Sequence, residues 1–193
     1  MDIERISIKL LNYFNVSSKV DELDYLKCKL GLEVLLINLS KILIIYGLAL
    51  ILGILKETLM MHIPYMVLRN SAFGIHSLSD KKCTLYSILL FVGIPWFVKQ
   101  TIQLSVQYLF IIQIAILVLL FLYAPGDSSK YKVEEKRKKK LKWESLLLAG
   151  LMGGILLLPV DLVHKNLVIL GLVIETSMIL PFIQKINFKG GQR

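Results

Sequence analysis

The sequence predicts an all-α integral membrane protein, a polytopic helical bundle with an N-terminal amphipathic interfacial helix and a short re-entrant or broken helix before the loop that carries the candidate active-site residues. Three observations predict this class. The 193 residues are 55% hydrophobic, more than an ordinary soluble domain. No charged residue occurs from position 100 to 126, which exceeds the roughly 20 residues that span a bilayer core. The basic residues gather in one block between apolar stretches.

Composition and charge exclude several classes. The apolar content rules out intrinsic disorder, and two cysteines, Cys28 and Cys83, are too few for a disulfide framework. The net charge of +9 arises from 23 Lys/Arg and 14 Asp/Glu, but no aromatic platform accompanies the basic block, so we expect no nucleic-acid partner. The length predicts a single membrane domain over residues 1–193.

The elements follow in order along the chain. Residues 1–30 form an amphipathic interfacial region, because Ile3, Ile6, Leu10 and Phe14 share a helical spacing with charged residues between them. We identify five hydrophobic spans, at residues 34–55, 84–99, 101–123, 145–163 and 167–183. These are helices, because lipid cannot satisfy backbone polar groups and no alternating strand pattern occurs.

The basic block predicts the orientation. Residues 127–143 form a basic loop that the positive-inside bias keeps cytoplasmic, where it contacts membrane lipids. Counting spans from this loop places the active-site loop and the C-terminus in the cytoplasm. The chain must then return to the cytoplasm between the first two spans, within residues 57–83. Since that stretch is short and carries Pro64, we expect a re-entrant or broken helix before the loop.

Chemistry-bearing residues collect at this boundary: Arg69, Gly74, His76, Asp80 and Cys83. A cysteine nucleophile needs a base, and histidine is the usual one near neutral pH. On a straight helix, residues 76 and 83 would lie about 10.5 Å apart along the axis, whereas a hydrogen bond needs roughly 3 Å. The two side chains therefore pair only where the chain turns, and Gly74 permits such a turn.

A helix start beside the cysteine favours its thiolate. Ser79 or Asp80 is a good N-cap before the apolar run. The unsatisfied amides of the first turn and the nearby Lys81 and Lys82 would then lower the pKa of the Cys83 thiol. The alternative is that Cys83 is a small packing residue and His76 an ordinary interfacial side chain.

Other polar residues have plainer interpretations. His76 and Cys83 supply too few ligands for zinc, so we expect neither metal nor cofactor. Cys28 reads as structural, and His62 and His164 as interfacial residues. Glu175 lies in an apolar run, which marks either a functional site or a carboxylic acid hydrogen-bonded between helices. Small residues near Gly153 predict close helix packing.

The pattern Arg69-x4-Gly74-x-His76-x6-Cys83, followed by a span, resembles the AgrB family of membrane cysteine endopeptidases that mature quorum-sensing peptides. The segment Tyr123-Ala-Pro-Gly-Asp127 before a lysine-rich loop is similar to a second hallmark of that family. The resemblance covers nearly the whole chain. Phe73 stands where many members have another glycine, which places loop geometry and substrate choice in question more than the reaction.

The resemblance implies that His76 is the catalytic histidine and Cys83 the nucleophile, with Arg69, Gly74, Asp80 and Asp127 as supporting or substrate-binding residues. It implies an AgrD-like propeptide as substrate, a thioester acyl-enzyme and a cyclic thiolactone or lactone product. It also implies a homodimer in the bacterial plasma membrane. Two alternatives from other classes remain: a small transporter or permease component, and a non-enzymatic membrane scaffold. For both of them Cys83→Ala would be silent.

Overall fold

The structure, a computed structural model, describes residues 3–15, 20–72, 80–101, 103–126 and 135–181, and only the backbone of residues 80–83 and 135–136. Regular structure in these residues is entirely helical, as the sequence predicts. The chain divides into two compact units, Met1–Leu48 and Ala49–Arg193. Each unit is described by itself.

The first unit holds α1 (Ile3–Tyr13) and most of α2 (Glu22–Ile51). Polar contacts join the two helices. Lys29 Nζ lies 2.7 Å from Glu4 Oε1, and the buried Ser7 donates a hydrogen bond of 3.2 Å to Glu33 Oε1. The ammonium group of Lys29 lowers the pKa of Glu4 by hydrogen bonding and charge. The N-terminal helix predicted from the apolar spacing is therefore present.

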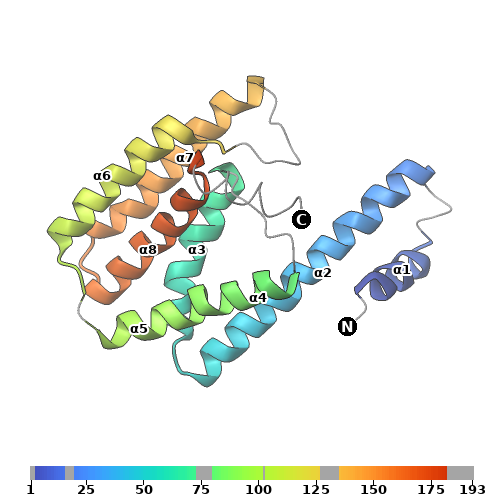
Figure 1. Cartoon of the computed structure of the whole chain (residues 1–193), viewed down its shortest axis with the longest axis horizontal. Coiled ribbons are helices and arrows are strands. Elements are labelled where there is room, and N and C mark those ends of the chain that lie inside the picture. Colours follow the sequence, from blue (N-terminus) through green and yellow to red (C-terminus); the bar gives the residue numbers. More distant parts are fainter. Residues whose placement is uncertain (1–2, 16–19, 73–79, 102, 127–134, 182–193) are drawn as a thin grey trace. The chain divides into compact units, whose positions relative to one another are not determined.

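The described residues of the second unit form five helical segments, and some of these combine more than one helix type. They are α3 (Leu55–Ala72), α4–η2–α5 (Asp80–Ile88, Leu89–Gly93 and Ile94–Gln100), α6 (Val106–Tyr123), α7–η3 (Glu135–Gly153 and Gly154–Leu157) and α8 (Leu162–Met178) (Figure 1). The π-helical turn η2 precedes Pro95, which lies in the first turn of α5. Proline lacks the amide that would continue the ladder, and a wider turn is one way to accommodate it.

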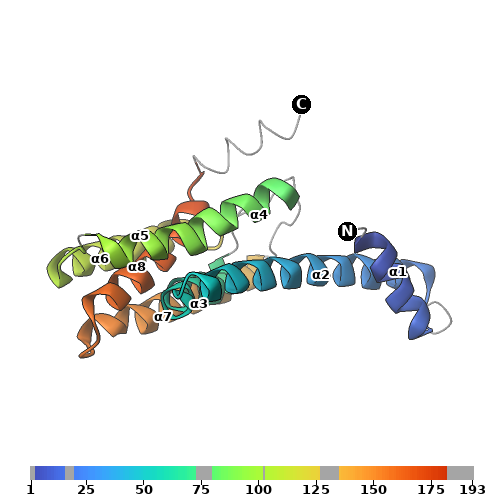
Figure 2. The same ribbon diagram turned by 90° about the horizontal axis from the view of Figure 1, so that it is seen from below.

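Contacts at the helix ends establish the relative directions. The side chain of Asn166 hydrogen-bonds both backbone groups of Leu104, so α6 and α8 begin together. Gly126 bonds Ala72, so α6 and α3 end together. Helix α5 runs the opposite way, because Lys99 near its end pairs with Glu57 near the start of α3. Figures 1 and 2 show α3, α6, α7 and α8 packed side by side.

Helix α8 lies at the centre of this unit and packs chiefly against α3. Gly171 permits the close approach, because a Cβ there would collide with the carbonyl oxygen of Met61. Pro64 is buried beside the same contact. Helix α3 nevertheless continues from Leu55 to Ala72 without a break, so the predicted break is absent. Tertiary packing on α8 outweighs the ladder bond that Pro64 removes.

Helices α6 and α7 also meet at small residues. Gln113 of α6 donates a hydrogen bond of 2.8 Å to the carbonyl of Ala149, and a Cβ at Gly153 would occupy the space of the Gln113 side chain. This agrees with the close packing predicted there. The buried Lys165 donates a bond of 3.0 Å to the Leu156 carbonyl, where η3 ends.

Large apolar side chains cover the outside of α6. Its exposed large apolar residues are Tyr108, Phe110, Ile111, Ile114, Val118, Phe121, Leu122 and Tyr123. Soluble monomers rarely expose a continuous apolar surface of this kind. Among the described residues, two helices, Glu22–Ile51 and Val106–Tyr123, are long and apolar enough to cross a membrane, and Thr84–Gln100 is a shorter apolar helix. The architecture fits a membrane protein.

Two details differ from the sequence prediction. The basic segment predicted as a loop over residues 127–143 is helical from Glu135 onward. Lys, Arg and Glu are good helix formers, and Lys140 lies 3.7 Å from Glu144 in the next turn. His62, which the sequence predicts to be interfacial and without a partner, is buried against the Phe91 ring, with 4.2 Å between centroids.

Candidate functional site

The C-terminal ends of α3, α6 and α8 meet at one end of the second unit, which we call the inner end and define by Ala72, Gly126 and Met178. The amide of Gly126 donates a hydrogen bond of 2.8 Å to the carbonyl of Ala72. Ala124 and Ala72 belong to one buried cluster, and the Ala124–Pro125 bond is cis. The Tyr-Ala-Pro-Gly segment therefore lies beside the residue at which the 73–79 loop begins.

An ion pair lies at the same end. Arg69, in the last turn of α3, places Nη1 3.1 Å from Oε2 of Glu175 on α8. The Glu175 side chain is 0% exposed and that of Arg69 is 20% exposed. The second carboxylate oxygen, Oε1, is buried and has no hydrogen-bond partner among the described residues. Glu175 thus compensates a cation that reaches the surface.

Aromatic and sulfur groups enclose this ion pair. The Arg69 guanidinium carbon lies 5.6 Å from the Tyr65 ring centroid, within the range of a cation–π contact. Nη1 also lies 3.5 Å from the sulfur of Met178, and the Tyr65 hydroxyl lies 3.8 Å from that sulfur. Tyr65 in turn packs on Phe91 of η2, with 4.8 Å between centroids. Helix α3, the π-helical turn η2 and helix α8 therefore all contribute to the surroundings of Arg69.

The structure describes the predicted site residues unevenly. Arg69 lies in α3 at the inner end. Helix α4 begins at Asp80 and contains the backbone of Cys83 in its first turns, where the sequence predicts a helix start. Gly74, His76 and Asp127 lie outside the described residues, as does the side chain of Cys83. The predicted pairing of His76 with Cys83 therefore stays a prediction.

Two of the segments that carry these residues adjoin one hydrogen-bonded pair. Residues 73–79 follow Ala72 in the sequence, residues 127–134 follow Gly126, and Ala72 and Gly126 are hydrogen-bonded. The C-terminal segment follows α8, whose Glu175 contacts Arg69 at this end.

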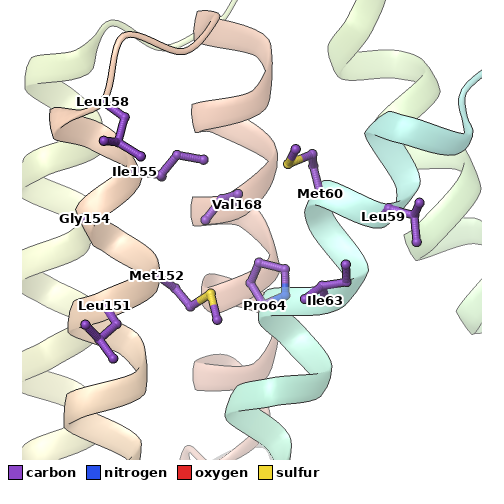
Figure 3. Close-up of a pocket in the computed structure, with 10 residues that line it drawn as sticks. All are labelled: Leu59, Met60, Ile63, Pro64, Leu151, Met152, Gly154, Ile155, Leu158 and Val168. Atoms are coloured by element: carbon purple, nitrogen blue, oxygen red, sulfur yellow. The ribbon is translucent and has the colours of Figure 1, made fainter.

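An open cavity of about 460 Å³ lies elsewhere, between α3, α7–η3 and α8 (Figure 3). Its lining is apolar: Leu59, Met60, Ile63, Pro64, Leu151, Met152, Gly154, Ile155, Leu158 and Val168. Because no titratable side chain faces it, this cavity lacks the groups that acid–base or nucleophilic chemistry requires. The described residues also contain no group of three or more His, Cys, Asp or Glu arranged to hold a metal ion.

Sequence reasoning missed the ion pair although it singled out both partners. Arg69 stood out as part of the loop motif and Glu175 as a carboxylate in an apolar run. A usable signal was present, because a carboxylate in an apolar helix requires a cation. The sequence alone does not show that α3 and α8 run in the same direction, and this direction brings the two residues together.

The fold and its inner end define a class: an all-helical protein with apolar helices fit to cross a membrane and a polar site where several helices end. A sequence model described as Accessory gene regulator B matches residues 3–179. The chain therefore belongs to the Accessory gene regulator B family, and the resemblance found in its motifs is confirmed.

Individual relatives agree with this assignment. An AgrB-like protein of Listeria innocua is 36% identical over 170 residues, which cover 87% of this chain and 82% of the relative. Accessory gene regulator protein B of Staphylococcus intermedius is 31% identical over 179 residues, 93% of this chain and 92% of the relative. The protein of that name from Staphylococcus aureus is 30% identical, covering 88% and 89%. No solved structure matches the chain.

Proposed function

We propose that this chain acts in an accessory gene regulator (agr) quorum-sensing system as a membrane cysteine endopeptidase that removes the C-terminal tail of an AgrD-like propeptide. The observation that supports the proposal is the hydrogen bond between Gly126 and Ala72 at the inner end of the second unit, because each of these residues adjoins one of the two motif-bearing segments. Family membership supports the regulatory role.

The proposed reaction uses two side chains. His76 accepts the proton of the Cys83 thiol, and the thiolate attacks the carbonyl carbon before the tail. The carbon–nitrogen bond breaks, His76 protonates the departing amine, and a thioester joins the propeptide to Cys83. A cysteine or serine of the propeptide then attacks this thioester, and His76 accepts the proton of its thiol or hydroxyl. The ring closes as a thiolactone or lactone, the bond to Cys83 breaks, and the departing thiolate recovers the proton from His76.

Other residues serve this reaction. Amides at the start of α4 stabilise charge on the attacked carbonyl, and Gly74 allows the loop to turn. Arg69 attracts a carbonyl or carboxylate of the substrate through its positive charge, because a guanidinium stays protonated at neutral pH. A membrane-boundary location excludes water and protects the thioester from hydrolysis.

The same proposal includes a topology. The chain crosses the bacterial plasma membrane several times, as a single membrane domain whose N-terminal helix α1 lies at the membrane surface. The 73–79 loop, the basic segment and the C-terminus face the cytoplasm, which follows the positive-inside bias. The active protein is a homodimer, as the resemblance implies. Impermeant labelling of single cysteines placed at positions 130 and 190 tests the orientation, and both should be protected in intact cells.

The experiment that tests the activity uses purified full-length protein in lipid and a synthetic propeptide. Intact mass should show a propeptide adduct on the chain and release of the tail. Cys83→Ala should abolish both, whereas the matched variant Cys28→Ala should retain them, because Cys28 lies on the exposed surface of α2. Tail release by Cys83→Ala would refute the proposal, and the absence of tail release by the unaltered chain would favour a transporter or scaffold.

A further inference from the structure

The pair Arg69–Glu175 is asymmetric in a way that a simple structural salt bridge does not require. The carboxylate is fully enclosed, and its cationic partner is one fifth exposed. The buried member belongs to the central helix α8, and the exposed member to the last turn of α3. The pair therefore holds the positive charge of Arg69 at the inner end, with the Glu175 carboxylate in the interior as its fixed partner.

Stability alone is a weak reason for this arrangement. Removing a carboxylate from water is costly, and well-packed apolar residues often replace buried ion pairs without loss of stability. Here one carboxylate oxygen also lacks a hydrogen-bond partner among the described residues. The benefit of Glu175 must then lie in what it does to Arg69.

Several contacts restrain the guanidinium together. Glu175 Oε2 lies 3.1 Å and the Met178 sulfur 3.5 Å from Nη1, while the Tyr65 ring lies 5.6 Å from the central carbon. A free arginine side chain loses considerable rotamer entropy on binding a ligand. A guanidinium already restrained in this way loses less of that freedom when substrate arrives.

The location completes the argument. Arg69 shares the last turn of α3 with Ala72, where the 73–79 loop begins and where Gly126 is bound. We propose that Glu175 is a positioning residue that holds the Arg69 guanidinium at the inner end for contact with the propeptide. This inference rests on the proposed function and assigns Glu175 no direct contact with substrate.

The first test separates KM from kcat. Glu175→Leu should raise the KM for the propeptide roughly 10-fold, about the contribution of one charge-assisted hydrogen bond, and leave kcat within about 2-fold. Glu175→Gln keeps a neutral acceptor, so it should raise KM about 3-fold. The matched control is Glu57→Leu, which removes another buried carboxylate, paired with Lys99 at 2.7 Å at the opposite end of α3. Its KM should stay unchanged.

The second test exchanges the charges. The double variant Arg69→Glu with Glu175→Arg rebuilds an ion pair but places the cation in the interior. Thermal stability in lipid should recover relative to either single variant, and propeptide KM should not. A merely structural pair would recover both, so recovery of KM would overturn the inference.

The outcomes distinguish the two proposals. If the unaltered chain releases no tail, the proposed function fails and this inference fails with it. If the unaltered chain is active and Glu175→Leu has the original KM, only this inference is refuted. If Glu175→Leu does not accumulate as folded protein, Glu175→Gln decides, and an unchanged KM in that variant also refutes it.

Discussion

Gly126 and Ala72 are joined by a backbone hydrogen bond of 2.8 Å although they lie 54 positions apart and in different motifs. The carbonyl belongs to the end of α3 and the amide to the chain that leaves α6. Both residues are buried. This bond joins the residue that precedes the segment with His76 in the sequence to the residue that precedes Asp127.

Removing that bond should impair processing. Gly126→Pro deletes the donating amide, and an unpaired buried carbonyl at Ala72 costs about 1–3 kcal/mol. We expect a lower melting temperature in lipid and at least a roughly 10-fold loss of tail release. Gly126→Ala retains the amide and serves as the control. Full activity in the proline variant would show that the two segments need no anchor.

The close contact of α3 and α8 depends on Gly171. In Gly171→Ala the new methyl group meets the Met61 carbonyl, and backbone cannot yield as a flexible side chain does. Overpacking of this kind costs about 1–3 kcal/mol. Thermal unfolding in lipid should show the loss. Gly150→Ala on α7 is the comparison, because nothing lies near a Cβ there, and its stability should equal that of the unaltered chain or exceed it.

Cys83 should be the more reactive of the two cysteines. A thiol near a helix start and beside lysines has a lowered pKa, so alkylation by iodoacetamide should reach half its maximal rate below the ordinary thiol pKa of about 8.5. The rate for Cys28, measured in Cys83→Ala, provides the reference. A pH midpoint of Cys83 alkylation near the ordinary thiol pKa would contradict an activated nucleophile. His76→Ala should raise this pH midpoint, because the variant removes the charge that the histidine supplies.

The basic segment should attract an acidic propeptide tail. Lys139→Glu combined with Lys140→Glu reverses charge on the exposed start of α7. We expect a higher KM at low salt and a difference that shrinks toward 1 M salt, where the Debye length falls to about 3 Å. Titrating salt in the cleavage assay measures this effect. Equal KM values at low salt would remove the segment from substrate binding.

The pattern of apolar residues in the sequence is enough to predict most of the fold. The uncharged stretch around α6 and the apolar run of α2 predict helices that the structure contains. Helix α4 begins at Asp80, where the sequence predicts a helix start. These features depend on neighbours along the chain, which is why the sequence reveals them.

At Pro64 and in the basic segment, the neighbouring sequence alone does not predict the structure. The sequence around Pro64 predicts a re-entrant or broken helix. Of these alternatives the break is absent, because packing of α3 on Gly171 keeps the helix whole. Residues 135–143 read as loop because they are charged, yet they continue the apolar helix that follows them. In both cases the outcome depends on the next helix in space or along the chain.

Residue order alone established an all-helical, strongly apolar chain, its basic segment, and a motif that places it in a family. It also named Arg69 and Glu175 separately. Their pairing at 3.1 Å, and the joining of Ala72 to Gly126, came from the three-dimensional packing. The physical reason is that α3, α6 and α8 run in one direction, and helix direction within a bundle follows from contacts between residues that are distant in the chain.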